Sequence, residues 1–229
     1  MIRRPAQMPM PLALPPRLTR ADFVAAPCNA QALAMIGQGD WPAGKLVLTG
    51  PEGSGKTHLL HIWAEAEDAL LIEAAALRAA APATLAEHGA VAIDAASGIA
   101  GDSAAETALF HLHNLLATQG GQLLLADRAP VRDWGLTLPD LASRLQAAAH
   151  VALGQPDDAL LAAVLGKLFA DRQVSVPDAL VAYLLPRMTR SLAAAQALVM
   201  RLDSEAIARK KPISVRLAAD VMQMSLDLD

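Results

Sequence analysis

Aromatic residues and cysteine are both scarce in this chain of 229 residues. Phenylalanine, tryptophan and tyrosine together make up 3% of it, and Cys28 is its single cysteine. One cysteine cannot form an internal disulfide, so the sequence fits a reducing compartment and we expect a cytoplasmic protein. Hydrophobic residues still account for 54% of the chain, so the core must be mainly aliphatic. Such a composition is typical of helices that alternate with buried strands.

An excess of positive charge and long apolar runs are also missing. The net charge is −4, whereas proteins that bind nucleic acid usually carry a basic surface. We therefore expect no direct sequence-specific DNA binding. No segment is long and apolar enough to cross a bilayer, so we expect no membrane partner. Prolines 9, 11, 15 and 16 interrupt the only stretch that faintly resembles a signal peptide.

Short apolar runs alternate with helical stretches up to residue 154, which predicts a parallel sheet covered by helices on both faces. Beyond residue 155 the strand pattern ends and only helical segments follow. We expect a tail (1–20), an α/β domain (21–154) and a helical domain (155–229). Residues 22–36 are expected to form a turn and then a helix, with Asn29 as a candidate cap. The expected strands are KLVLT (45–49), ALLIEA (69–74), AVAID (90–94), QLLLAD (122–127) and HVALG (150–154).

The strongest motif is GPEGSGKT, residues 50–57, which lies between the first expected strand and a helix expected from about Lys56. It fits G-x-x-x-x-G-K-[ST] completely. The glycines let backbone N–H groups wrap phosphates, and the helix amino terminus adds positive potential. We expect Lys56 to reach the β- and γ-phosphates and Thr57 to coordinate Mg²⁺. The nucleotide-binding residues expected here are Gly50, Pro51, Glu52, Gly53, Ser54, Gly55, Lys56, Thr57 and, behind the loop, His58.

Acidic residues end two further expected strands. Asp94 is expected to hold Mg²⁺ with Thr57; the alternative, a helix cap, is disfavoured by the phosphate loop. Many ATPases of this architecture carry a second acid at the next position, where this chain has Ala95. We therefore expect weak or absent ATP hydrolysis by the chain alone. Asp127, followed by Arg128, could sense the γ-phosphate or form a strand-end salt bridge.

Together these motifs resemble the ATPase domain of bacterial replication initiators of the DnaA type, within the AAA+ superfamily, over about residues 22–220. The resemblance implies an AAA+ P-loop fold, in which helices flank a five-stranded parallel sheet, with a small all-α lid domain. The matching segments are DFVAAPCN (22–29) for the adenine side, GPEGSGKTHLL (50–60) for the phosphate loop, AID (92–94) for the metal strand, FHLHNLLATQGGQLLLADRAP (110–130) for the sensor region and LPDLASRL (138–145) for the arginine-finger segment.

The resemblance also implies roles for single residues. Phe23, Val24 and Asn29 would lie near the adenine of ADP or ATP, and Asp127 would be the first sensor. Arg190 would be a second sensor in the lid, although an alignment shifted by one turn would put an alanine there. Which of the two nucleotides is the working ligand is left open, as is self-association.

The layout resembles the Hda-like regulators of this family, because neither the initiators' helix-turn-helix domain nor their helicase-contact domain is recognisable. The resemblance implies two partners, the DNA polymerase sliding clamp and the DnaA-type initiator. Arg144 would act as an arginine finger in trans, so that the initiator hydrolyses its ATP and over-initiation is prevented. The alternatives are a nucleotide-gated adaptor or a helicase-loader-like ATPase.

A short peptide in the tail would bind the clamp as a Q-x-x-hydrophobic-x-Leu motif. Its contact residues would be Gln7, Met8, Met10 and Leu12. The alternative is a proline-rich spacer without a ligand. The string QMSLDL, residues 223–228, has the same glutamine-to-leucine spacing, and whether it also binds the clamp is left open.

Overall fold

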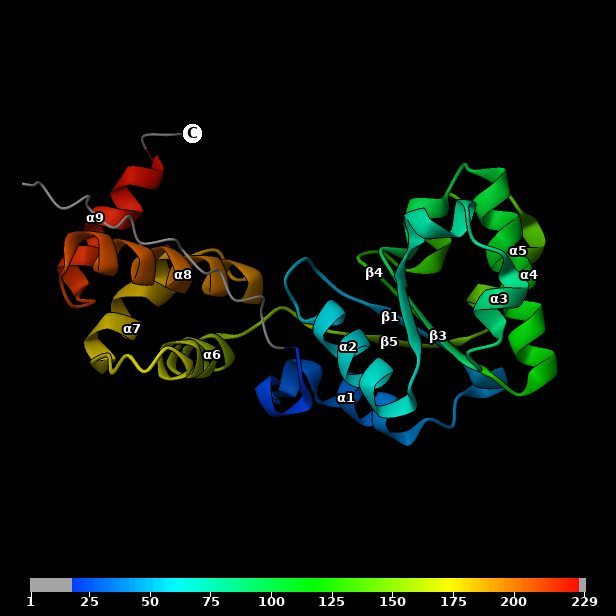
Figure 1. Ribbon diagram of the computed structural model, residues 1–229, viewed down its shortest axis with the longest axis horizontal. Helices are drawn as coiled ribbons and strands as arrows, with labels where there is room; N and C mark the ends of the chain where they lie inside the picture. Colours follow the sequence, from blue (N-terminus) through cyan, green and yellow to red (C-terminus); the bar gives the residue numbers. More distant parts are fainter. Residues whose placement is uncertain (1–17, 227–229) are drawn as a thin grey trace, which may run out of the picture. The chain divides into compact units, whose positions relative to one another are not determined.

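The computed structural model describes residues 18–226. They form two compact units, residues 18–157 and a second unit that begins at Asp158 (Figure 1). Within the described residues, the first unit contains a sheet with helices and the second contains helices alone.

A parallel sheet of five strands, in the order β2-β3-β4-β1-β5, forms the centre of the first unit. The predicted α/β sheet is therefore confirmed. Strand β5 runs from Ala149 to Ala152, so it starts one residue before the predicted stretch and ends two residues before it; beyond the strand, Leu153 N–H bonds to the Thr49 carbonyl and Gly154 N–H bonds to the Cys28 carbonyl. The strands are β1 (Lys45–Thr49), β2 (Leu70–Glu73), β3 (Ala90–Asp94), β4 (Gln122–Asp127) and β5 (Ala149–Ala152).

Helices cover both faces of this sheet because side chains alternate along each strand. Leu46 and Leu48 of β1 pack under α1 (Pro27–Gln38) and α2 (Lys56–Glu67). Val47 packs on the opposite face, with the helices that follow the other strands (Figure 1). Those helices are α3 (Pro82–Ala86), α4 (Ser103–Gln119) and α5 (Pro139–Gln146).

Short 3₁₀ turns join the elements of the first unit. They are η1 (Arg20–Asp22), η2 (Pro42–Gly44), η3 (Ala74–Arg78), η4 (Ala96–Ile99) and η5 (Val131–Asp133).

The predicted cap of α1 was wrong. The helix begins at Pro27 after Ala26, because proline has no N–H to leave unpaired and its φ suits the first helical turn. Asn29 lies inside that turn, where its Oδ1 accepts from Ala26 N–H at 2.9 Å. Its Nδ2 donates to the Val24 carbonyl at 3.0 Å, so Asn29 shapes the chain just ahead of the helix.

The second unit is a helical bundle with its own apolar core. Leu165 and Phe169 of the first helix pack against Leu180, Val199 and residues of the last helix. The helices are α6 (Asp158–Asp171), α7 (Asp178–Leu184), α8 (Leu192–Arg209) and α9 (Val215–Leu226), with the 3₁₀ turn η6 (Leu185–Arg187) between α7 and α8. Within residues 18–226, none of the helices is both long and apolar enough to cross a membrane.

Lys45, at the start of β1, is 2% exposed, and burial lowers its pKa from 10.5 to about 8. Between these two values the unfolded chain binds more protons, so the free energy of unfolding should rise with pH in this range. We expect Lys45→Met to abolish that rise and to add about 1 kcal/mol at pH 7, because no charge is then buried. Urea titrations from pH 7 to 10.5 test this.

The matched control is Lys211→Met, because the side chain of Lys211 is exposed. This variant should keep the wild-type pH dependence. If Lys45→Met destabilised the protein at pH 7, the hydrogen bond from Lys45 Nζ to the Gly121 carbonyl, 3.3 Å long, would outweigh the cost of burial.

Candidate nucleotide-binding site

The carboxyl ends of three neighbouring strands meet at one edge of the sheet, where open α/β sheets bind ligands. β1 ends at Thr49, which pairs with Asp127 at the end of β4. β3 lies on the other side of β4 and ends at Asp94. The fold therefore brings the phosphate loop and both acidic residues of the sequence prediction to the same edge.

The phosphate loop leaves β1 through glycines whose backbone angles other residues rarely adopt. Gly53 has φ 69°, and Gly55, which precedes the first residue of α2, has φ 101°. A Cβ at Gly50 would lie 2.8 Å from the Leu153 carbonyl oxygen, so a side chain does not fit there. α2 begins directly after this loop, and the N–H groups of a first helical turn have no acceptor within the helix. This arrangement of donors fits the phosphate groups of a nucleotide.

Thr57 and Asp94 meet at the mouth of the loop. Thr57 Oγ1 donates to Asp94 Oδ2 at 2.6 Å, across residues that are far apart in the sequence. The other oxygen, Asp94 Oδ1, accepts from Ala95 N–H at 2.8 Å, which fixes the carboxylate. A hydroxyl and a carboxylate are hard oxygen ligands of the kind Mg²⁺ uses beside phosphates, so this pair fits the predicted Mg²⁺ site.

Lys56 lies over the same loop. Its Nζ donates to the Gly50 carbonyl at 2.7 Å and to the Pro51 carbonyl at 2.9 Å. Burial lowers the pKa of Lys56, while the negative charges of Asp94 and Asp127 act to raise it. The ammonium group is therefore placed where phosphate oxygens would meet the loop.

Asp127 is buried and organises the loops around the site. Its Oδ2 accepts from Ser97 N–H of η4 at 2.7 Å. Its Oδ1 accepts from the N–H groups of Arg128 at 2.6 Å and of Ala129 at 3.3 Å. Asp127 thus joins the segment after β3 to the segment after β4, and its role as a phosphate sensor stays a prediction.

Arg128 forms an ion pair whose partner the sequence analysis did not name. Its Nη2 lies 2.9 Å from Glu52 Oε2 in the phosphate loop. Both side chains are mostly exposed, at 68% and 71%, so the pair contributes little to stability. The alternative of a strand-end salt bridge therefore applies to Arg128, with Glu52 as its partner.

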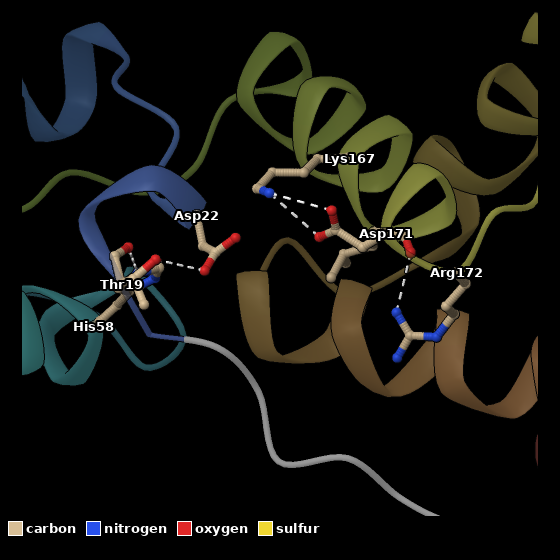
Figure 2. A network of polar contacts seen from close by, with 7 residues as sticks. Thr19, Asp22, His58, Lys167, Asp171 and Arg172 are labelled. Atoms are coloured by element: carbon tan, nitrogen blue, oxygen red, sulfur yellow. Dashed lines mark hydrogen bonds and ion pairs between the residues drawn. The ribbon is translucent and has the colours of Figure 1, made fainter.

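Phe23, one of the residues predicted on the adenine side, lies against the start of α2. His58 Nε2 is 2.8 Å from the Thr19 carbonyl oxygen, and Thr19 Oγ1 donates to Asp22 at 2.7 Å (Figure 2). The ring of Phe23 meets the His58 imidazole edge-on, with centroids 5.2 Å apart. These contacts hold the segment before α1 beside the phosphate loop. The adenine contacts of Phe23, Val24 and Asn29 stay predictions.

Arg144 lies elsewhere in the first unit. Its guanidinium stacks on the ring of Phe110 in α4, 5.3 Å from the centroid, and its side chain is exposed. α5 covers the sheet face opposite α2 (Figure 1). Burial lowers the pKa of His113 in α4, and the positive charges of Lys45 and Arg144 lower it further.

Arg190 belongs to the second unit, just before α8. Its Nη2 lies 2.8 Å from Asp158 Oδ1, and both side chains are more than half exposed. The next residue, Ser191, caps α8 by accepting from Ala194 N–H at 3.3 Å. The second-sensor role of Arg190 stays a prediction.

The predicted clamp-binding residues Gln7, Met8, Met10 and Leu12 lie outside the described residues. Gln223 lies in α9 with an exposed side chain. Within residues 18–226, no group of three or more histidine, cysteine, aspartate or glutamate residues could hold a metal ion by themselves.

Glu106 is a residue of this unit that sequence reasoning missed. Its side chain is fully buried in α4 and binds the segment leading into α5, which carries Arg144. A signal existed in the sequence, because Glu106 stands among the apolar positions Ala105, Leu109 and Leu112 of one helix face. A charged residue at such a position indicates a buried carboxylate with specific partners.

No family model matches the chain, but several solved structures share its fold. Domain III of the replication initiation protein DnaA from Thermotoga maritima has a TM-score of 0.76 and 19% identity, over 92% of this chain and 97% of that chain. AMPPCP-bound DnaA from Aquifex aeolicus has a TM-score of 0.67 and 18% identity, over 82% and 66%. The RuvB Holliday junction branch migration motor from Thermotoga maritima has a TM-score of 0.66 and 17% identity, over 91% and 72%. The chain therefore has an AAA+ P-loop fold like that of domain III of DnaA.

Proposed function

We propose that this chain is a DnaA-related AAA+ regulator that stimulates ATP hydrolysis by a DnaA-type replication initiator. The observation that carries the proposal is the position of Arg144. It is exposed and stacked on Phe110, on the sheet face opposite α2. An arginine placed there is available to a second protein. Its charge can stabilise the phosphoryl group that is transferred in that protein's site.

The chain's own nucleotide, ADP or ATP with Mg²⁺, has a structural role in this proposal. Lys56, the loop backbone and the first turn of α2 would hold the phosphates, and Thr57 with Asp94 would hold the metal. Bound Mg²⁺ neutralises phosphate charge. Ala95 follows Asp94 directly, and its methyl group cannot orient an attacking water. Slow hydrolysis by the chain alone is the consequence, and the bound nucleotide then keeps the unit in one shape.

Hydrolysis by the partner tests the proposal directly. An initiator loaded with radiolabelled ATP is mixed with this protein and with sliding clamp on DNA. We expect release of labelled phosphate to accelerate only when all three proteins are present. If the initiator hydrolyses its ATP at the same rate with and without this protein, the proposed function is wrong.

The tail would hold the protein on the clamp. Changing Gln7 and Leu12 together to alanine should abolish clamp binding, because it removes the polar group and the main apolar side chain of the proposed peptide. ADP affinity should stay the same, since the phosphate loop lies in a separate part of the chain. Clamp binding by surface plasmon resonance and ADP binding by calorimetry measure the two effects.

Changing Gln223 and Leu228 to alanine provides the matched control at the other end of the chain. This variant should bind the clamp like the wild type. If it loses binding while the change at Gln7 and Leu12 has no effect, the carboxyl-terminal string is the clamp peptide and the tail is a spacer.

A second candidate is a nucleotide-gated adaptor that recruits another protein to the clamp. An intact phosphate loop beside Ala95 favours it equally, because such an adaptor needs a bound nucleotide and no hydrolysis of its own. An adaptor does not need Arg144, so Arg144→Ala should leave its function intact and separates the two candidates. A helicase-loader-like ATPase would show multiple turnovers by itself.

A further inference from the structure

The side chain of Glu106 makes a dense set of hydrogen bonds in the first unit. Its Oε2 accepts from Leu138 N–H at 2.7 Å, from Thr137 N–H at 2.9 Å and from Thr137 Oγ1 at 3.0 Å. Its Oε1 accepts from Gly101 N–H at 2.9 Å and from Thr137 N–H at 3.1 Å. Four donor groups from two loops therefore converge on one carboxylate of α4.

These donors belong to two segments of the first unit, one around residue 101 and one at residues 137–138. Leu138 is the N-cap residue of α5, the helix that carries Arg144. Gly101 lies between η4 and α4, in the connection that begins where Asp94 ends β3. Asp127 holds the same connection at Ser97, as described above. Glu106 therefore joins the start of the arginine helix to the segment that follows the metal strand.

The chemistry of Glu106 explains why a carboxylate occupies this position. A glutamate side chain that is fully buried must be compensated, because an unpaired charge in the core is very costly. Burial acts to raise the pKa of Glu106, but the hydrogen bonds from Thr137, Gly101 and Leu138 outweigh it and hold the pKa below its ordinary value. The group is ionised at neutral pH, and an ionised carboxylate only accepts hydrogen bonds, which suits donors on every side.

We propose that Glu106 is a positioning residue for Arg144, which it holds in place for the partner's site by fixing the start of α5. The inference rests on the proposed function. Arg144 lies six residues after Leu138, on a helix of eight residues. A short helix follows any displacement of its first turn, so a shift at Leu138 moves the guanidinium as well. Misplacing a reacting group by about 1 Å can lower a rate about a hundredfold.

Glu106→Gln tests the proposal, because it keeps the shape but turns an N–H₂ group toward backbone donors. We expect the maximal rate of stimulated hydrolysis to fall by roughly ten- to a hundredfold. The initiator concentration that gives half the maximal rate should stay within about twofold, because the partner surface is otherwise intact. In the Arg144→Ala background the same change should have no further effect.

Thr137 offers a gentler pair of variants, in case Glu106→Gln does not fold. Thr137→Val keeps the size but removes the hydroxyl that donates to Glu106, and should lower the maximal rate by about threefold or more. Thr137→Ser restores the hydroxyl and should restore the rate. Equal rates for the valine and serine variants would overturn the proposal.

Asp102→Ala is the matched control for simple loss of stability. Asp102 also lies at the start of α4, where it accepts from the N–H groups of Ala104 and Ala105 and from Arg78 Nη1 of η3 at 3.0 Å, but none of these bonds involves α5. Removing this cap should lower the melting temperature without lowering the rate per folded molecule. If Asp102→Ala lowers the rate as much as Glu106→Gln, Glu106 has only a structural role.

Hydrogen exchange on the full chain with ADP separates this inference from the proposed function, because it needs no partner. In Glu106→Gln, amides of residues 137–146 should exchange about tenfold faster or more, while those of α2 stay unchanged. Unchanged exchange in this segment would overturn the inference, whatever the hydrolysis assay shows. If exchange rises but the wild-type protein does not stimulate the initiator, the proposed function fails and the link between Glu106 and α5 stands.

Discussion

Replacing Arg144 with alanine should lower the stimulated ATP hydrolysis of the initiator by about a thousandfold, which is the scale expected for an arginine finger supplied in trans. The physical reason is that charge develops on the phosphoryl oxygens during transfer, and a guanidinium can bind two of them at once. Alanine lacks the guanidinium group and therefore its positive charge. A single-turnover assay with ATP-loaded initiator, clamp and DNA measures the change.

Two further variants show whether the effect belongs to this arginine. Arg144→Lys keeps the charge but loses the planar fork, so it should restore only part of the rate. Arg132→Ala removes another exposed arginine, whose Nε lies 3.7 Å from Asp133 Oδ1 in η5. This variant should behave like the wild type. If Arg144→Ala stimulates the initiator as well as the wild type does, the adaptor function is correct and the arginine finger is not.

Replacing Lys56 with alanine should weaken ADP binding by roughly ten- to a hundredfold, because hydrogen bonds to charged groups contribute about 1.5–3 kcal/mol each. Lys56 Nζ already lies over the loop, 2.7 Å from the Gly50 carbonyl oxygen, so it can turn to a phosphate without moving the backbone. Calorimetry with ADP and Mg²⁺ measures the affinity. Stimulation of the initiator should fall in parallel if the bound nucleotide sets the shape of the unit.

Arg128→Ala is the control for a nearby positive charge at the same edge of the sheet. Arg128 is exposed and paired with Glu52, so removing it should change ADP affinity by less than about fivefold. Unchanged ADP affinity in Lys56→Ala would contradict the assignment of residues 50–57 as the phosphate site.

The strands could be predicted because each is a short apolar run that ends at a turn or an acid. In AVAID, the residues Val91, Ala92 and Ile93 are all buried, as strands covered on both faces must be. The start of α1 was predicted less well. Asn29 was assigned as the cap because such residues often cap helices, but its side chain bonds back to Ala26 from inside the first turn. The proline two residues earlier decided where the helix begins.

The phosphate loop and the Thr57–Asp94 pair could be predicted from the sequence for a different reason. A motif of fixed spacing determines where its own donors lie, and the rule that parallel strands end at one edge brings Asp94 to them. The ion pair between Arg128 and Glu52 was not predictable. It joins two loops whose distance in space depends on the strand order, which no local pattern contains.

By itself, the sequence determined the class of fold, the phosphate loop and the absence of an acid after Asp94, because these depend on local periodicity and on motifs of fixed spacing. Only the tertiary structure showed that Arg144 stacks on Phe110 on the face opposite α2, and that Glu106 binds Thr137 and Leu138. Such contacts join residues about thirty positions apart. They form when α4 and α5 pack side by side on one face of the sheet, and that packing depends on the whole core.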